Sequence, residues 1–219
     1  MQVNAAVRSS KAEEVYSYVK QQILSGAWKE GDRLNDSLLA EEIGVSRISV
    51  REALFRLVES GIVEKAYWKG YFIKEITDKL IADIVELRIA LESCAVRNLM
   101  RELTNDEVET LRSIIDESEE LLYAGDFTQY LAKDYSFHET IYQTQHNTYI
   151  RSTLDNLQLA IHFVRYKSMG KDETFYTRAL SSIRWHRRIL HAIEMRDADE
   201  AVSLLIQHLD EHQTEATSK

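Results

Sequence analysis

The stretch between Gly44 and Gly61 constrains the fold of this chain more than any other part. Ser46 is a favourable N-cap residue, and Gly61 stands where a helix that starts there would end. The apolar residues of this helix recur at intervals of three and four, at Val50, Ala53, Leu54, Leu57 and Val58. That period predicts an amphipathic helix with one face in a core, and it leaves Arg47 and Arg51 one turn apart on another face.

Two helices are expected before this one. Residues 10–25 form the first, with Ser10 as its N-cap and Gly26 as its end. Residues 36–43 form the second, which stops at Gly44, two residues before the next N-cap. Two helices joined by a short turn that contains glycine are typical of the helix-turn-helix, whose second helix reads the major groove of DNA.

A β-hairpin is expected after the third helix. Residues 62–66 and 71–74 are rich in aromatic and β-branched side chains, and a glycine-containing turn at residues 68–70 separates them. Residues 1–75 are therefore predicted to form a winged helix-turn-helix DNA-binding domain. The chain carries a net charge of −9, but residues 1–75 hold 11 basic and 11 acidic residues, so the excess acid lies in residues 76–219.

Residues 76–219 are predicted to form an all-α antiparallel bundle, which makes the fold class mainly α. Capping and turn residues divide this part into about six helices: residues 77–101, 106–123, 126–145, 149–168, 172–196 and 198–212. No apolar run approaches the roughly 18 residues of a membrane span. The single cysteine, Cys94, falls in an apolar helical pattern and is expected in the core, which suits the cytoplasm.

Several polar residues share the apolar faces of the predicted bundle helices. Asp134 and His138 lie four residues apart within one such face, and His186 lies in the apolar arc of another helix. On the last helix, periodicity places both His208 and His212 at the rim of the apolar face, so it does not indicate which of the two joins the other buried polar residues. An Asp–His hydrogen bond would satisfy the first pair, and so would a metal ion, because an unpaired buried charge is costly.

A dense set of matches to a known pattern covers residues 10–75. The matching residues are Gly31-Asp32-Arg33-Leu34, Leu39-Ala40-Glu41, Gly44-Val45-Ser46-Arg47, Val50-Arg51-Glu52-Ala53-Leu54, Leu57, Gly61-Ile62-Val63 and Gly70-Tyr71-Phe72-Ile73. With them, this part resembles the DNA-binding domain of the GntR family of bacterial transcription regulators. Glu30 and Ser49 stand where that family usually has proline, and Ser37 stands where some members carry a basic residue that contacts DNA.

The resemblance implies a set of DNA-contacting residues. Arg47 and Arg51 would contact guanine edges or phosphates in the major groove, for which the guanidinium fork is suited. The other implied contacts are made by Ser46 and Ser49 to phosphates, by Arg33 to the backbone, and by Lys69 and Gly70 of the wing to the minor groove. Arg56, further along the helix, is expected to form a salt bridge or to face a dimer partner.

A second set of matches covers residues 77–212. It comprises Leu87-Arg88, Leu91-Glu92, Asp134, Phe137-His138, Asn147, His186-Arg187-Arg188-Ile189-Leu190 and His208-Leu209. This part resembles the FCD ligand-binding domain of the FadR branch of the GntR regulators, and its helix number is closest to the shorter VanR-like subgroup. The resemblance implies a divalent metal ion bound by Asp134, His138, His186 and His208. Zinc or nickel is favoured at a nitrogen-rich site, and manganese and iron are compatible with it.

The expected function is that of a homodimeric, ligand-responsive transcription regulator, more often a repressor in this family, which binds a palindromic DNA operator. Arg88 and Arg165 are the expected partners of a small carboxylic-acid effector at the metal, unless they form ordinary salt bridges. Two alternatives stay open, a helical-bundle hydrolase or oxygenase that uses the metal and a regulator whose metal is purely structural. An enzyme is not expected, because neither a placed general base nor a nucleophile motif accompanies the metal set.

Overall fold

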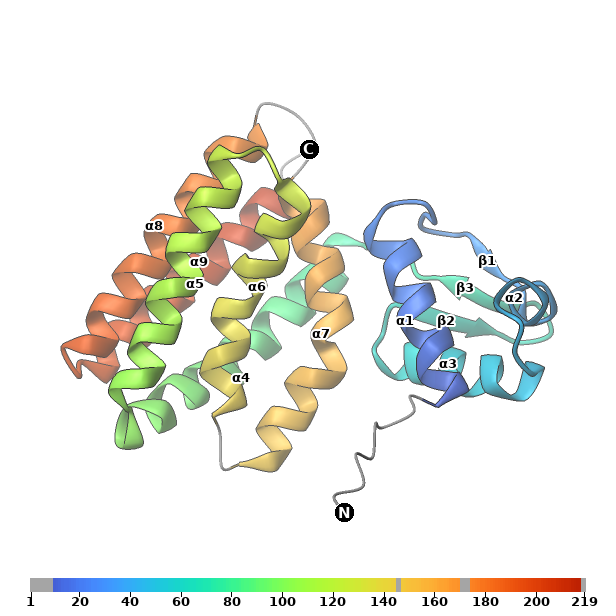
Figure 1. The fold of residues 1–219 in the computed structure, drawn as a ribbon, viewed down its shortest axis with the longest axis horizontal. Helices are drawn as coiled ribbons and strands as arrows, with labels where there is room; N and C mark the ends of the chain where they lie inside the picture. The colour runs from blue at the N-terminus through green and yellow to red at the C-terminus, as the bar shows by residue number, and fades with distance from the viewer. Residues whose placement is uncertain (1–9, 145–146, 170–173, 218–219) are drawn as a thin grey trace, which may run out of the picture. The chain divides into compact units, whose positions relative to one another are not determined.

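The computed structural model describes residues 10–144, 147–169 and 174–217, which divide into two compact units between Ile76 and Thr77 (Figure 1). The sequence places this boundary one residue earlier. The described residues are mainly helical, with one small antiparallel sheet in the first unit and an all-helical second unit. The predicted fold class is therefore confirmed.

The first unit is a winged helix-turn-helix. Its elements are α1 (Lys11–Leu24), β1 (Arg33–Leu34), α2 (Asp36–Ile43), α3 (Arg47–Glu59), β2 (Val63–Ala66) and β3 (Gly70–Ile73). Each helix begins at a side-chain cap, since the oxygens of Ser10, Asn35 and Ser46 accept hydrogen bonds from backbone N–H groups of the first turn. Gly44 ends α2 with φ +73°, a left-handed conformation that glycine adopts without strain.

Strand β1 was not expected from the sequence. Its two residues pair with β3 in the register Arg33↔Phe72 and Leu34↔Tyr71, which gives the strand order β1-β3-β2. A strand of two residues is too short to show an alternating pattern in the sequence, so it is recognised only by its pairing with β3 in the structure. The hairpin of β2 and β3 was expected, and it pairs Val63 with Ile73 and Ala66 with Gly70.

The core of the first unit forms where α3 packs on α1, on α2 and on strand β2 of the wing. The buried face of α3 is the apolar face predicted from the sequence, and its Val50, Ala53, Leu54 and Leu57 are fully buried. Burying a Val, Leu or Ile side chain stabilises a fold by about 1.5–3 kcal/mol. This packing holds the opposite face of α3 in solvent, where its arginines lie.

The described part of the second unit contains six helices, as expected. They are α4 (Asp78–Glu102), α5 (Asn105–Tyr123), α6 (Phe127–Gln143), α7 (Thr148–Met169), α8 (Thr174–Glu194) and α9 (Ala198–Thr217). The capping box of Thr104 and Glu107 opens α5 as predicted. Helix α9 extends five residues beyond the predicted end at His212, and its last turn still buries Ala216.

Helices α4, α6, α8 and α9 enclose the centre of the second unit, with α5 packed on α6 and α8 and with α7 on α9 (Figure 1). Cys94, which was expected in the core, is exposed. The buried stripe of α4 runs instead through Arg88, Glu92 and Ala95, so the helix is turned with its polar pair inward. Within the described residues, no helix is both long enough and apolar enough to cross a membrane.

Candidate metal centre and DNA-binding surface

Three histidines from three helices converge at the centre of the second unit. The Nε2 atom of His186 on α8 lies 3.2 Å from that of His138 on α6 and 3.1 Å from that of His208 on α9. The Nε2 atoms of His138 and His208 are 3.3 Å apart. All three side chains are at most 3% exposed. His138 and His186 lie within the apolar faces of their helices and His208 lies at the rim of its own, so the packing that buries these faces brings the three rings together.

A buried carboxylate orients His138. Its Nδ1 atom lies 2.8 Å from Oε2 of Glu92, and Oε1 of Glu92 accepts a hydrogen bond of 2.7 Å from Arg88. Burial alone would raise the pKa of Glu92, but Arg88 and His138 lower it to about 2. Because this carboxylate only accepts hydrogen bonds, Nδ1 of His138 is the donor, and Nε2 is the ring atom directed at the other two histidines.

The structure gives Asp134 a different neighbourhood from the three histidines. Its Oδ2 accepts a hydrogen bond of 3.0 Å from Nε of Arg165. Its Oδ1 accepts bonds from Arg165, from Ser182 at 2.5 Å and from Tyr130 at 3.1 Å. Burial would raise the pKa of Asp134, but the charge of Arg165, the charge of His186 and the hydrogen bonds from Arg165 and Ser182 together outweigh it and hold the pKa well below its usual range. Asp134 does not belong to the group of described residues whose ligand atoms lie within 4.8 Å of one another.

The three histidines fit a divalent metal ion. Burial lowers the pKa of His186 to about 3 and that of His208 to well below its usual value, so both rings are neutral ligands at neutral pH. Nitrogens bound to one ion at about 2.0–2.1 Å lie about 2.8–3.0 Å apart in octahedral geometry and about 3.3–3.4 Å apart in tetrahedral geometry, and the observed separations of 3.1–3.3 Å lie between these values. Three convergent imidazoles are a donor set that suits zinc or nickel.

A small buried cavity adjoins the histidines and brings both predicted effector-binding arginines together. Its lining consists of Arg88, Leu131, Asp134, Tyr135, His138, Ile161, His162, Arg165 and His212. Its volume of about 10 Å³ gives room for about one water molecule. Both arginines are engaged by carboxylates, Arg88 by Glu92 and Arg165 by Asp134. A carboxylate ligand larger than water therefore requires these side chains to move.

Two residues that the sequence analysis did not select belong to this cavity. His212 is 6% exposed, and its Nδ1 has no hydrogen-bond partner among the described residues. His162, whose place in the helical period lies off the apolar face, is half-buried, with its ring centroid 4.0 Å from that of Tyr135. The role of Glu92 was also missed, although its spacing of four residues from Arg88 places both on one helical face.

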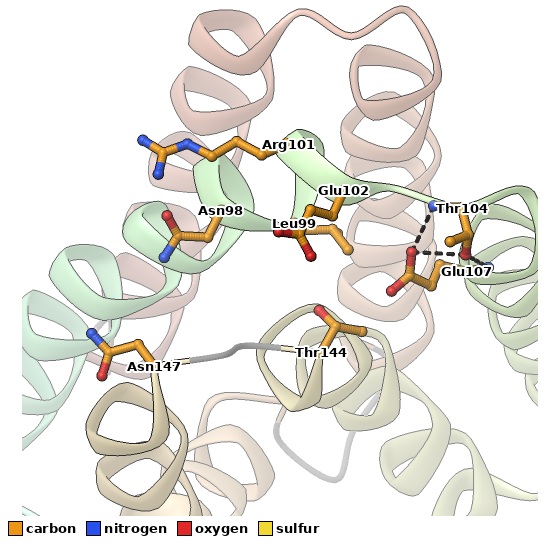
Figure 2. A pocket seen from close by; sticks show the side chains of 8 residues that line it. All are labelled: Asn98, Leu99, Arg101, Glu102, Thr104, Glu107, Thr144 and Asn147. Atoms are coloured by element: carbon orange, nitrogen blue, oxygen red, sulfur yellow. Dashed lines mark hydrogen bonds between the residues drawn. The ribbon is translucent and has the colours of Figure 1, made fainter.

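A larger cavity lies elsewhere in the second unit (Figure 2). It has a volume of about 520 Å³ and is lined by Asn98, Leu99, Arg101, Glu102, Thr104, Glu107, Thr144 and Asn147. Figure 2 shows Thr104 and Glu107 bonded to each other, because they form the cap of α5. None of the residues predicted to bind metal, effector or DNA lines this cavity.

The predicted DNA-contacting residues of α3 lie at its start. The side chains of Arg47 and Arg51 are 57% and 60% exposed. Asp36, at the start of α2, accepts from Nε of Arg51 at 2.6 Å and from Arg47 at 3.4 Å. Ser46 and Ser49 share a hydrogen bond of 2.9 Å between their hydroxyls. Asp36 was missed by sequence reasoning, because only the packing of α2 on α3 brings it to the arginines.

The wing places the remaining predicted residues beside α3. A groove of about 440 Å³ is lined by Arg33, Leu34, Asn35, Asp36, Arg51, Lys65, Ala66, Trp68, Lys69, Gly70 and Tyr71. The Arg33 side chain lies over Gly70, where an added Cβ would meet its Nε at 3.7 Å. Arg56 points elsewhere and pairs with Glu13 at 2.7 Å, the salt-bridge alternative of the two that the sequence left open.

We expect the metal-free protein to lose stability as the pH falls below about 6.5. Burial depresses the pKa values of His186, His208 and His212, so these rings stay neutral in the folded protein while they protonate in the unfolded chain. Each ring that stays neutral contributes a loss of about 1.4 kcal/mol per pH unit. Urea unfolding in the presence of a chelator between pH 8 and pH 5 measures this slope. A free energy of unfolding that is constant over this range would contradict the expectation.

Comparisons with known proteins agree with this architecture. Residues 11–73 match the family model described as bacterial regulatory proteins, gntR family, and residues 83–211 match the FCD domain. The HTH-type transcriptional regulator YdhC of Bacillus subtilis (strain 168) is 29% identical over 198 residues, which cover 90% of this chain and 87% of that protein. The gluconate operon transcriptional repressor of Bacillus licheniformis is 26% identical over 207 residues, with 94% and 85% covered.

A solved structure shares the fold over most of the chain. The structure of E. coli McbR/YncC superposes with a TM-score of 0.77 at 23% identity, covering 92% of this chain and 94% of that one. The matched families and these relatives are transcription regulators, not enzymes. Because the FCD match spans more than half of the sequence and the gntR match covers the winged helix-turn-helix, this chain belongs to the GntR family of bacterial transcription regulators and carries an FCD domain.

Proposed function

We propose that the protein represses transcription as a homodimer that binds a palindromic DNA operator through its two winged helices. The observation that carries this proposal is the exposed pair Arg47 and Arg51 at the start of α3, beside the basic wing. Arginines at this end of a recognition helix reach base edges in the major groove. A two-fold symmetric dimer presents two such helices to the two half-sites of a palindrome. We place this activity in the cytoplasm, where the operator DNA lies.

We further propose that the second unit binds a divalent metal ion and senses a small carboxylic acid there. His138, His186 and His208 would hold the ion, and the family resemblance adds Asp134 as a fourth ligand. A bound ion would offer an open coordination position to a carboxylate oxygen. Arg88 and Arg165, which line the adjoining cavity, would pair with the other oxygen of the acid.

The buried pairs of these arginines suggest how an acid could act on the helices. Arg165 of α7 is bonded to Asp134 of α6, which is also bonded to Ser182 of α8. An incoming carboxylate would compete with Asp134 for Arg165 and so alter the contacts among three helices. A ligand changes the DNA-binding equilibrium only if it binds one of the two arrangements more tightly.

A purely structural metal is the second candidate, and the small volume of the cavity favours it. The two candidates differ in a direct measurement. DNA affinity is measured for the metal-loaded protein with and without a panel of small carboxylic acids, and melting is measured with and without a chelator. A sensory site changes the DNA affinity with one of the acids, whereas a structural site changes the melting temperature with the chelator alone.

We expect Arg51→Ala to weaken binding to the operator by about 1–3 kcal/mol, which is about 5- to 150-fold, because a bidentate contact to a base is lost. The DNA is a duplex that the wild-type protein selects from a random pool, and affinity is measured by fluorescence anisotropy. Arg56→Ala is the matched control on the same helix, since Arg56 pairs with Glu13 and does not line the groove between the wing and α3. Equal affinities of Arg51→Ala and the wild type would exclude the proposed docking of α3.

A further inference from the structure

The turn between β2 and β3 carries two large aromatic side chains in solvent. Trp68 is 92% exposed and Tyr67 is 82% exposed. Their rings meet edge to face with centroids 5.0 Å apart, and Trp68 has no other ring contact with the described residues. An indole as exposed as this one buries almost no apolar surface, so it contributes little to folding.

The backbone of this turn does not call for a tryptophan either. Trp68 has φ +63°, a left-handed conformation in which the Cβ of an L residue crowds the following carbonyl. The hairpin closes through its main chain, where the N–H of Lys69 donates to the carbonyl of Ala66 at 3.1 Å. Glycine adopts this conformation without strain. The tryptophan therefore occupies a position where a smaller residue would serve the fold better.

The charges beside Trp68 favour a polyanionic partner. The groove that it lines contains four basic residues, Arg33, Arg51, Lys65 and Lys69. Asp36 is the acid in that lining, and it is already paired with Arg51. Because Arg51 belongs to α3, the tip of the wing and the start of α3 border the same groove. A peptide arm beside a helix in the major groove meets the adjacent minor groove, where other proteins insert apolar side chains.

We propose that Trp68 contacts DNA directly, with its indole inserted in the minor groove next to the bases that α3 reads. This inference rests on the proposed docking of α3 on DNA. The ring would be buried there against deoxyribose and base edges, which gives the exposed apolar surface a partner. Such a contact adds apolar binding energy to a domain whose 11 basic and 11 acidic residues leave it without a net positive charge.

The test compares variants of the full-length protein on the selected duplex over a series of salt concentrations. Trp68→Ala should bind about tenfold more weakly at every salt concentration, because the lost contact is apolar and releases no counterion. Lys69→Ala should lower the slope of log K against log salt by about 0.9 if it contacts one phosphate. Trp68→Phe should retain most of the affinity. Trp68→Gly should also bind weakly while it melts no lower than the wild type.

Tryptophan fluorescence gives an independent readout. The chain has three tryptophans, so the difference between the wild type and Trp68→Phe isolates the signal of Trp68. That signal should shift or be quenched when the duplex is added, because the indole leaves water. Tyr149→Ala, which removes an aromatic ring that is 83% exposed in the second unit, is the matched control and should bind as the wild type does.

The outcomes separate this inference from the proposed function. Trp68→Ala within twofold of the wild-type affinity, together with a clear loss for Arg51→Ala, would overturn the role of Trp68 and leave the docking of α3 in place. No loss for Arg51→Ala would refute the docking itself. A signal of Trp68 that does not respond to the duplex would also overturn the inference.

Discussion

Replacing Asp134 with asparagine is expected to lower the free energy of unfolding of the metal-free protein by about 3–5 kcal/mol. The carboxylate is 2% exposed, and it balances the charge of Arg165, which is 6% exposed. Asparagine keeps the shape but removes the charge, so Arg165 is left as a buried cation without its counterion. Urea unfolding in the presence of a chelator measures the loss.

Two controls make this prediction specific. Asp83→Asn removes the carboxylate of a surface pair with Lys79, whose side chains are 54% and 81% exposed, and should cost no more than about 1 kcal/mol. The double variant Asp134→Leu with Arg165→Met removes both charges and should recover most of the lost stability. A cost for Asp134→Asn as small as that for Asp83→Asn would show that the buried pair is not held as described.

The same variant also tests whether Asp134 binds metal. The family resemblance implies that it does, whereas its oxygens here accept bonds from Arg165, Ser182 and Tyr130. Zinc affinity of Asp134→Asn is measured by competition with a chelating dye. A loss of tenfold or more would show that Asp134 is the fourth metal ligand. An unchanged affinity would show that the Asp134 carboxylate pairs with Arg165 and does not bind the metal.

Replacing His186 with alanine is expected to abolish stoichiometric binding of zinc or nickel. The Nε2 of His186 lies within 3.2 Å of those of both other histidines, so its loss removes a third of the donor set. A metal at 1,000 times its dissociation constant stabilises the folded state by about 4 kcal/mol. The variant should therefore lose the difference in melting temperature between metal-loaded and chelator-treated protein.

The control for this prediction lies on the same helix. His191 is 74% exposed and is not in the three-histidine group, so His191→Ala should bind metal as the wild type does. The ring of His186 stacks on Phe137 with centroids 4.1 Å apart, and its loss will lower stability by itself. Metal content by elemental analysis and the His208→Ala variant separate the two effects. Full metal content in both variants would refute the proposed centre.

Much of the fold follows from local signals in the sequence. Ser10, Asn35, Ser46, Thr77 and Thr104 cap helices through hydrogen bonds within the first turn, so each start depends only on residues close in the chain. The apolar period of each helix then indicates which face is buried. The end of α8 was less predictable, since Arg196 takes φ +58° and donates to the carbonyls of Met100 and Leu103 at the end of α4.

The residues of the candidate sites could be predicted from the sequence. Which of these residues contact one another could not. The helical period places His138 and His186 on buried faces, and it leaves His208 and His212 equivalent. In the structure His208 joins the other two histidines, while His212 lines the cavity next to Arg88 and Arg165. Likewise, nothing near Arg51 in the sequence indicates that Asp36 binds it, because the two residues lie on different helices.

The sequence by itself determined the elements and the faces they bury, including the arginine-bearing face of α3 that lies in solvent. The tertiary structure alone decided which buried groups meet: the three histidines with one another, Glu92 with His138, and Asp134 with Arg165. The physical reason is that caps and periodicity act over a few residues. The convergence of side chains 22 to 70 residues apart depends instead on how whole helices pack.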